Sequence, residues 1–409
     1  MTLNRRTFIS TSAVALAGCA VSPHIILQEA NLQHTPEDFD YVLVAKEAPI
    51  TILPNTKTPA LTFNGGFPAP TLRATQGKPL RIKFINQLNE PTTIHWHGIR
   101  LNIAMDGVPY LTQPPIMPGE TFIYEFICPD AGTFWYHPHM NSVHQLGRGL
   151  VGALIVDEKE KVVFDAEVIL GLKDWRLNDN GSFKPLSIPR QAARMGTLGN
   201  VKAVNGKRQP VFTIPAGGTV RVRLLNLDSA RVFTISTKDF NAQVIAVDGN
   251  PLREPVALNV HAIEHAIGAG MRLDLGFIAP KTIGEDIIIY DRKGRLNFEI
   301  CRLRTVAANT KTHTQLPTLP INPIPTPDLN NAEALRFIFE WAGALSPVKD
   351  GQVKREFWTI NKRPWEGMSA DSIPKPLATL TLGKTYLVEL HNATPHSHPI
   401  HLHGHTFTV

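Results

Sequence analysis

Three stretches of the chain share one pattern, and this repeat restricts the fold more than any other feature. FNGGFPAPTLRATQGKPLRIKFIN covers residues 63–86, VNGKRQPVFTIPAGGTVRVRLLN covers residues 204–226, and a looser copy ends in TLGKTYLVELHN at Asn392. Each copy has an Asn-led turn, a Gly-containing turn and an alternating apolar and polar strand that closes on Asn, which is typical of half-buried β-strands. Because the copies lie far apart in the sequence, they predict three similar domains and not a solenoid.

The repeat and the composition together predict an all-β chain of three consecutive β-sandwiches. The 33 prolines and 29 glycines among 409 residues fit a protein with many turns. We expect the first sandwich over residues 39–158, the second over 161–306, a Pro-rich linker over 307–331 and the third sandwich over 332–409. Such a sandwich needs roughly seven strands in about a hundred residues. The third copy has too few strands for this, so we expect the third domain to be incomplete.

The first 22 residues are typical of an export signal. Arg5 and Arg6 precede an apolar stretch that is too short for a permanent membrane anchor. Twin arginines in this position resemble a Tat signal, which predicts a periplasmic protein. The sequence LAGC at residues 16–19 also resembles a lipobox, in which a lipid on Cys19 would tether the protein to a membrane. Ordinary cleavage nearby, which would leave a soluble periplasmic protein, is the alternative.

Charge and cysteine content give fewer indications. The formal net charge of +6 is spread without long Lys or Arg blocks, so nothing indicates a nucleic-acid partner. Cys128 and Cys301 fall in different predicted domains. They can be two buried thiols or, in an oxidising compartment, a disulfide, and the sequence leaves both open. It gives no indication of the oligomeric state.

Histidine pairs follow the closing Asn of the first and third copies but not that of the second. HWHG and later WYHPH lie in the first domain, and HPIHLHG lies in the third. The segment LDSARVFTIS that follows Asn226 has no histidine, so we expect the middle domain to be a spacer without metal ligands. Residues two apart on a strand face the same side, so each pair directs two imidazoles into one site, and imidazole suits copper, zinc, iron or nickel. The candidate ligands are His95, His97, His137, His139, His398, His401 and His403.

HWHG, GTFWYHPH and HPIHLHGH resemble three of the four copper-binding motifs of the multicopper oxidases, the laccase-like family of three cupredoxin domains, which are Greek-key β-sandwiches. MDGVPYLTQPPIMPGETFIYEF and QLGRGLVGALIVD are similar to stretches of bacterial members. The resemblance implies a catalytic role in proton delivery for Asp106 of MDGVP, although Asp-Gly is also a common turn dipeptide. For the metals it implies that His95 and His401 bind the type 2 copper, His97 and His137 one type 3 copper, His139 and His403 the other, and His398 the type 1 copper.

The resemblance implies one-electron oxidation of a reducing substrate coupled to four-electron reduction of dioxygen to water, with four coppers in the complete protein. The fourth motif, a His-Cys-His run, is absent, and no cysteine follows Cys301. We therefore expect that the chain is cut before the segment that completes the third domain and the type 1 site, and that this form is inactive. The seven methionines are scattered, which favours phenolic or aromatic donors over metal ions as the reducing substrate.

Three alternatives remain beside this interpretation. A non-catalytic copper-binding, copper-tolerance or structural periplasmic protein of the same fold is one, although retention of all seven histidines favours an enzyme. A two-domain copper nitrite reductase would carry a cysteine beside the first-domain pair, and WYHPH has none. HAIEH at residues 261–265 matches an inverted zinc-protease motif, but that motif requires a helix and the surrounding sequence predicts turns and strands.

Overall fold

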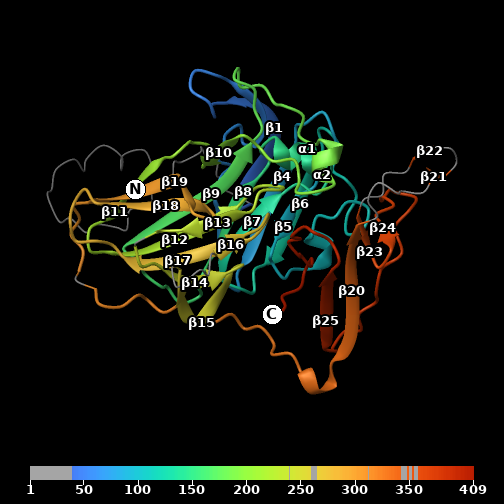
Figure 1. Ribbon diagram of the computed structural model, residues 1–409. Coiled ribbons are helices and arrows are strands. Elements are labelled where there is room, and N and C mark those ends of the chain that lie inside the picture. The colour runs from blue at the N-terminus through green and yellow to red at the C-terminus, as the bar shows by residue number, and fades with distance from the viewer. Residues whose placement is uncertain are drawn as a thin grey trace, which may run out of the picture.

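The computed structural model describes residues 39–238, 240–258, 265–311, 313–341, 348–349, 352–353 and 358–409. Over these residues the chain consists of β-sheets with only short helical segments (Figure 1). The predicted all-β class is therefore confirmed. The predicted signal segment and Cys19 lie outside the described residues. In the part of the chain that is described, no helix has the length and apolar character needed to cross a membrane.

The first sandwich consists of two four-stranded sheets in the orders β2-β1-β4-β6 and β3-β8-β7-β5. The alternation of β4 turns Leu80, Ile82 and Phe84 into the core between them. The pairs β1–β4 and β3–β8 are parallel and the other neighbours are antiparallel. Its elements are β1 (Tyr41–Ile50), β2 (Thr58–Phe63), β3 (Leu72–Thr75), β4 (Pro79–Asn86), β5 (His95–His97), η1 (Ile103–Met105), β6 (Thr121–Ile127), β7 (Gly132–His137), α1 (Ser142–Gly147) and β8 (Gly152–Asp157).

The second sandwich repeats this arrangement with longer sheets. A six-stranded sheet has the order β10-β9-β12-β17-β14-β15 and a five-stranded sheet the order β11-β19-β18-β13-β16. The parallel pairs β9–β12 and β11–β19 correspond to β1–β4 and β3–β8. Its elements are β9 (Ala166–Trp175), α2 (Pro189–Ala192), β10 (Val201–Val204), β11 (Val211–Pro215), β12 (Thr219–Asn226), β13 (Phe233–Ser236), β14 (Gln243–Val247), β15 (Asn250–Ala257), β16 (His265–Ile267), β17 (Arg272–Ile278), β18 (Asp286–Lys293) and β19 (Leu296–Val306).

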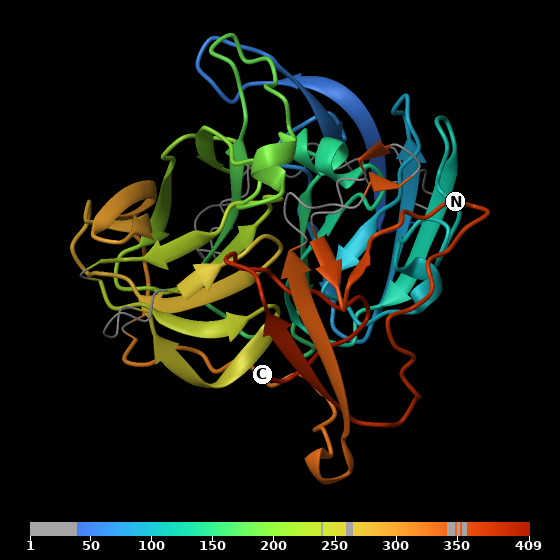
Figure 2. The ribbon, with the colours of Figure 1, turned by 45° about the vertical axis from the view of Figure 1, so that its right-hand side comes forward.

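The third unit contains one four-stranded sheet, β24-β23-β20-β25, in which β20 and β25 are parallel like β1 and β4 (Figure 2). None of the residues in these four strands is buried, as expected for an incomplete sandwich. The division of the chain at residues 158, 161, 306 and 332 stays a prediction. The elements are η2 (Leu329–Asn331), β20 (Glu333–Trp341), β21 (Val348–Lys349), β22 (Gln352–Val353), β23 (Trp358–Ile360), β24 (Arg363–Pro364) and β25 (Tyr386–Asn392).

The Asn that closes each repeat has the same structural role in all three units. Its side-chain oxygen accepts a hydrogen bond from the backbone N–H two residues further on, in each case. Its amide nitrogen donates to a carbonyl four or five residues further on, which fixes the turn after the strand. These donor–acceptor distances are 3.0 Å from Asn86 to Glu90, 2.8 Å from Asn226 to Arg231 and 2.7 Å from Asn392 to His396.

A buried network of charges joins the first two sandwiches. Arg223 Nη1 donates to Thr133 Oγ1 of β7 over 2.8 Å, and Thr133 donates to Asp274 Oδ1 of β17 over 2.7 Å. Arg221 completes the network through Asp274 and Glu158, with Arg221 Nη1 2.7 Å from Glu158 Oε1. All five side chains are buried, and every charge has an opposite partner within hydrogen-bond distance. Such a satisfied network fixes the relative position of the two sandwiches.

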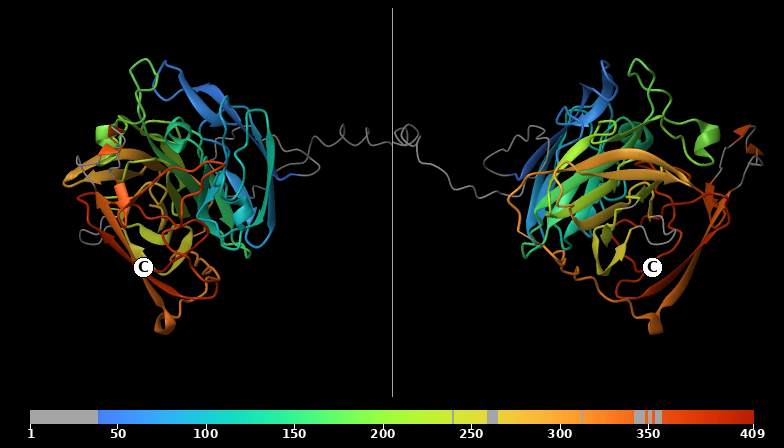
Figure 3. Two further views of the ribbon diagram at one scale, coloured as in Figure 1. Left: turned by 90° about the vertical axis from the view of Figure 1, so that its right-hand side faces the viewer. Right: turned by 60° about the vertical axis from the view of Figure 1, so that its left-hand side comes forward.

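The predicted linker lies along this seam and is held there by Asn322. Asn322 Oδ1 accepts from Ala131 N over 2.9 Å, and its amide donates to Ala131 O and to Gly249 O. The linker therefore joins the first and second sandwiches before the chain enters the third unit. In Figure 3 that unit, in orange and red, lies along one flank of the body formed by the first two sandwiches.

Cys128 and Cys301 are free thiols and do not form a disulfide. Each is fully buried, Cys128 in the core of the first sandwich and Cys301 in the core of the second. Burial raises the pKa of Cys128 to about 12, and burial also raises the pKa of Cys301. Both thiols are therefore protonated and shielded in the native protein.

We expect neither Cys128 nor Cys301 to react with a thiol reagent at neutral pH in the folded protein, because only an exposed thiolate is nucleophilic. Both should react once the chain is unfolded in denaturant. Mass spectrometry of the labelled Cys19→Ser protein gives the count under each condition. Rapid native labelling of either residue would contradict the burial described above.

Candidate metal centre

The histidines of HWHG lie on β5, the edge strand that pairs with β7. The antiparallel register places His95 opposite His137 and His97 opposite Trp135. Trp96 alternates to the other face and is fully buried in the core, with its ring 5.1 Å from the ring of Phe126. Because Trp96 packs into the core on the opposite face of the strand, His95 and His97 both project toward the third unit. The structure therefore places both histidines on one face of β5, as the spacing of the pair predicted.

The histidines of HPIHLHG reach the same place from the third unit. His401 Nε2 lies 3.3 Å from His95 Nε2, across a separation of 306 residues in the chain. The His401 ring stacks on the His97 ring with 3.8 Å between the centroids. The His403 ring lies 4.0 Å from that of His95. Imidazoles of the first and third units therefore meet across their interface, as the sequence predicted.

Six of the seven predicted ligands gather into one cluster. The ligand atoms of His95, His401 and His403 all lie within 4.8 Å of one another, and so do those of His95, His97 and His137. His139 adjoins them, with its ring 4.9 Å from that of His403. The six-histidine cluster consists of His95, His97, His137, His139, His401 and His403.

The hydrogen bonds of these rings leave lone pairs directed into the cluster. His95 Nδ1 lies 2.8 Å from Asp106 O, and His137 Nδ1 lies 3.0 Å from Pro138 O. A carbonyl oxygen can only accept, so both Nδ1 atoms carry the proton and both Nε2 atoms are unprotonated. His95 Nε2 faces another imidazole nitrogen, His401 Nε2, and a metal ion can be coordinated by both nitrogens. The donor set therefore fits copper and other imidazole-binding metals.

Burial keeps most rings of the cluster neutral. It lowers the pKa of His95, and it holds the pKa values of His97 and His137 well below the usual range, with further lowering from the neighbouring imidazoles. The same burial, together with His403, lowers the pKa of His139 to about 4. Metal ligation requires neutral imidazole, so these rings are in the binding form at neutral pH.

Asp106 connects the two sides of the cluster. Its backbone oxygen accepts from His95, and its Oδ2 accepts from His403 Nδ1 over 2.7 Å. Burial opposes its charge, but the hydrogen bonds from His403 and His95 hold the pKa of this carboxyl well below its usual range. Asp106 also caps η1 and precedes Gly107, whose φ is +79°. The residue therefore both forms the Asp-Gly turn and contacts the candidate ligands.

His398 lies apart from the cluster. Its ring stacks on Phe339 of β20 with 5.8 Å between centroids and lies 5.0 Å from the ring of Trp358. Its Nε2 is 2.8 Å from Thr394 Oγ1. The two cysteines that the structure describes, Cys128 and Cys301, belong to the other two units. Among the described residues no thiol therefore accompanies His398.

Of the other histidines that the structure describes, none joins the cluster. His144 Nδ1 lies 3.0 Å from Glu90 Oε1, and His405 Nδ1 lies 2.9 Å from the backbone oxygen of His403. His265 begins strand β16, so the helix required by the zinc-protease motif is not present there, while His261 lies outside the described residues.

Sequence reasoning missed two residues beside the cluster. Trp135 stacks on His137 with 4.2 Å between centroids and lies 4.9 Å from His97. It precedes His137 by two positions, so the period of the strand alone could have placed both on one face. Arg272 approaches from the middle unit, where a Cβ on Gly98 would lie 2.3 Å from its Nη2. No sequence signal indicates that approach, because β17 is far from HWHG in the chain.

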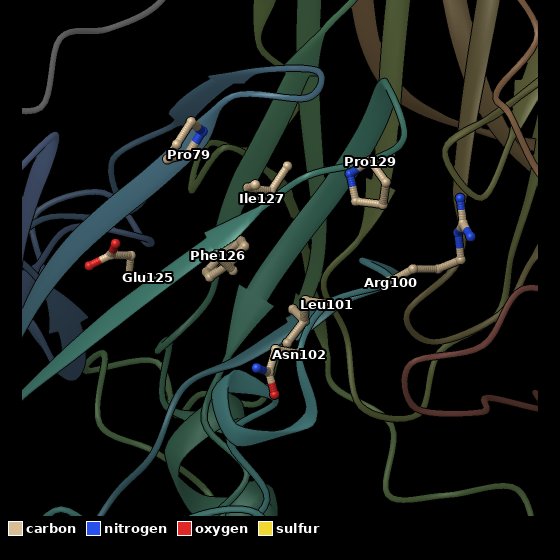
Figure 4. Close-up of a pocket in the computed structure, with 8 residues that line it drawn as sticks. All are labelled: Pro79, Arg100, Leu101, Asn102, Glu125, Phe126, Ile127 and Pro129. Atoms are coloured by element: carbon tan, nitrogen blue, oxygen red, sulfur yellow. The ribbon is translucent and has the colours of Figure 1, made fainter. Parts of the chain in front are cut away.

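A shallow pocket on the first sandwich is a different feature. It lies at the end of β6 and is lined mainly by apolar groups, including Phe126 and Pro129 (Figure 4). Arg100 at its rim pairs with Asp130. None of the candidate ligands lines this pocket, so it has no part in the metal centre.

Comparison with known proteins agrees with this geometry. Family models described as multicopper oxidase match residues 44–161 and 344–409. A crystal structure of a multi-copper oxidase from Pseudomonas thermotolerans superposes with a TM-score of 0.79 and 41% identity, over 89% of this chain and 83% of that one. The chain belongs to the multicopper oxidase family. The resemblance predicted from the histidine motifs is therefore confirmed, as are the cupredoxin-type fold, the oxidoreductase class with dioxygen as acceptor, and copper as the cofactor.

Two curated relatives show the functional range of this multicopper oxidase family. Laccase-2 of Botryotinia fuckeliana is 30% identical over 88% of this chain and 68% of its own length. Copper resistance protein A of Escherichia coli is 41% identical over 148 residues, which are 36% of this chain and 23% of that protein.

Gly107→Ala is expected to destabilise the protein and weaken the cluster, because a Cβ there would lie 1.9 Å from Ile94 O, directly before His95. Gly119→Ala is the matched control, since Gly119 has a φ of +84° but open space around it. The control should lose only the roughly 1–2 kcal/mol of a left-handed alanine. Urea unfolding of both variants measures the difference, and equal losses would show that the close contact has no effect.

Proposed function

We propose that this protein is a laccase-like oxidase that couples one-electron oxidation of a small reducing substrate to four-electron reduction of dioxygen to water. The convergence of imidazoles from the first and third units, with the unprotonated Nε2 of His95 3.3 Å from the Nε2 of His401, carries this proposal. Copper bound by these nitrogens would supply the redox chemistry. The buried surroundings of His95, His97 and His137 would exclude bulk water from that chemistry.

The contacts within the cluster support one division of its ligands. The ring nitrogens of His95 and His401 lie within hydrogen-bond distance, as do those of His97 and His137, and the ring of His139 adjoins that of His403. These three pairs correspond to the type 2 site and the two halves of the type 3 site implied by the resemblance. His97 Nδ1 lies 3.4 Å from His137 Nε2, and both belong to the first sandwich. The type 2 pair, in contrast, takes one ligand from each outer unit.

Asp106 is proposed to hold and deliver protons to the cluster. Its carboxylate accepts from His403 Nδ1 and so orients that ring, while its backbone oxygen orients His95. A carboxylate in direct contact with both outer units can pass a proton toward either. It also fixes the tautomer in which each Nε2 is free to bind metal.

His398 is proposed as one ligand of the type 1 copper, where electrons enter. Its distance from the cluster and its aromatic surroundings, Phe339 and Trp358, support a separate site. A thiolate ligand for that site is not among the residues that follow Cys301. We propose phenols or aromatic amines as the reducing substrate, because the sequence has no methionine-rich segment.

Periplasmic export is also a proposal. Arg5, Arg6 and the following apolar stretch support a Tat signal, and the LAGC sequence supports a lipid on Cys19. The alternative function is copper sequestration without turnover. The similarity of 148 residues of the chain to a copper resistance protein favours it as the second candidate.

Copper(II) should bind the purified chain through the six-histidine cluster. His137→Ala should weaken that binding by more than roughly tenfold, because loss of even an indirect contact to a ligand typically has this effect. Competition with a chelator gives the affinity, and electron paramagnetic resonance shows whether imidazole nitrogens coordinate the ion. His144→Ala is the matched control, since His144 pairs with Glu90 outside the cluster. Equal affinity of the two variants would refute the ligand assignment.

Asp106→Asn should keep the copper content of the copper-loaded protein but lower kcat for oxygen uptake by about a hundredfold, the usual contribution of a proton donor. Asparagine can still accept from His403 but cannot carry a proton. Asp130→Asn, a buried aspartate paired with Arg100, is the control and should leave kcat unchanged. An unchanged kcat in Asp106→Asn contradicts the proton role, and copper binding without any oxygen uptake supports sequestration.

A further inference from the structure

The middle unit carries none of the predicted ligands, yet one of its loops reaches the cluster. Residues 268–271 connect β16 to β17, and Arg272 follows as the first residue of β17. The loop is fixed from within its own sandwich. Gly270 N donates to Asn226 O, and Asn226 N donates to Met271 O, each over 3.0 Å. Asn226 is the residue that closes the second repeat, so this loop is held by the same position that precedes the histidine motifs of the outer units.

Toward the first sandwich, the 268–271 loop contacts a candidate ligand directly. Gly270 has a φ of +82°, and a Cβ on it would lie 3.0 Å from His97 Cε1 and 3.4 Å from Trp135 Cζ2. Any side chain at residue 270 would therefore push against the His97 ring or the indole behind it. The absence of a side chain lets the loop backbone support that ring.

Toward the third unit, the same loop contacts the segment that carries the other ligands. A Cβ on Gly268 would lie 3.0 Å from Pro399 Cγ. Pro399 lies between His398 and His401 in HPIHLHG. The 268–271 loop therefore contacts both histidine-bearing segments, each at a glycine.

Arg272 ties this loop to the first sandwich. Its side chain is buried, and its Nη1 donates to Gly270 O over 3.1 Å while its Nε donates to Thr133 O of β7 over 3.2 Å. Its Nη2 donates to Asp248 O over 2.9 Å, and its guanidinium carbon lies 5.8 Å from the centre of the Phe134 ring. One guanidinium thus joins the loop backbone to the strand that ends in His137.

We propose that Arg272, Gly268 and Gly270 are positioning residues that set where the ligands of the first and third units meet. The planar fork of Arg272 fixes the distance between the loop and β7, and the two glycines let the loop approach His97 and Pro399 at contact distance. This inference rests on the proposed function, because it assumes that the six-histidine cluster binds copper.

Alanine substitutions with matched controls test the contact at each glycine. Gly270→Ala is compared with Gly284→Ala, whose φ of +85° carries the same strain but whose surroundings are open. Gly268→Ala is compared with Gly66→Ala, where the nearest atom to a new Cβ lies 3.9 Å away. We expect Gly270→Ala and Gly268→Ala to bind copper(II) roughly tenfold more weakly and with an altered paramagnetic resonance spectrum. Both controls should match the unsubstituted protein in affinity and spectrum.

Arg272→Lys and Arg272→Met separate geometry from charge. Lysine keeps the positive charge but cannot form the forked hydrogen bonds, so a positioning role predicts that it fails to restore the spectrum. Recovery with lysine would instead assign the effect to charge and overturn the role proposed for Arg272. If neither Arg272 variant folds, the comparison of each glycine variant with its control still tests the positioning role.

These experiments distinguish failure of the positioning role from failure of the proposed function. Gly270→Ala and Gly268→Ala that match their controls, in a protein that binds copper(II) through imidazole, refute the positioning role alone. An unsubstituted protein that shows no imidazole coordination refutes the copper centre itself, and the positioning role with it.

Discussion

The meeting of His95 Nε2 and His401 Nε2 at 3.3 Å is the contact on which the arrangement of the outer units depends. With His95 Nε2 unprotonated, His401 Nε2 satisfies it either as an N–H donor or by sharing a metal ion with it. The sheet of the third unit has no buried residue of its own. Its docking therefore depends strongly on this contact, and a metal that binds only the assembled site would stabilise the docked arrangement.

The first two sandwiches form a contrasting, internally satisfied body. Arg221, Arg223 and Asp274 are buried at their seam, but each charge has a partner, and Thr133 adds a neutral hydrogen-bonding bridge. Removal of one partner of such a network typically costs about 3–5 kcal/mol, so it resists separation of the two sandwiches. Four of the six cluster histidines lie on this body. The rigid part of the molecule thus carries most of the site, and the third unit brings the last two rings to it.

The sequence was sufficient for the class of fold and for the membership of the cluster. Alternation along β4 and β12 marks them as strands, and the spacing of His95 and His97 requires that they share a face. These features are local, and such periodicity can be recognised from the residues of one segment alone. The meeting of His95 with His401 could be predicted only through the family resemblance, since nothing in either segment specifies the other.

Other features could not be predicted because they depend on packing between distant strands. The buried, unpaired state of Cys128 and Cys301 follows from their placement in two separate cores. The second role of Asp106 depends on the approach of His403, which an Asp-Gly dipeptide does not reveal. Trp135 is different, because its spacing from His137 was available and only its contact with His97 required the structure.

The middle unit contributes none of the candidate ligands and still contacts the cluster. Asn226 bonds the backbone of Gly270 and Met271 as Asn86 bonds that of Gly119 and Glu120, but the loop of Gly270, unlike that of Gly119, contacts a candidate ligand. The outer units supply imidazole side chains to the cluster, whereas the middle unit contacts it through the backbone of Gly270. The prediction that the middle domain is a spacer rested on the absence of histidines in the segment that follows Asn226. It did not consider that a glycine such as Gly270 lets the backbone approach an imidazole ring closely. The description of the middle unit as a spacer is therefore incomplete, because the 268–271 loop contacts the cluster.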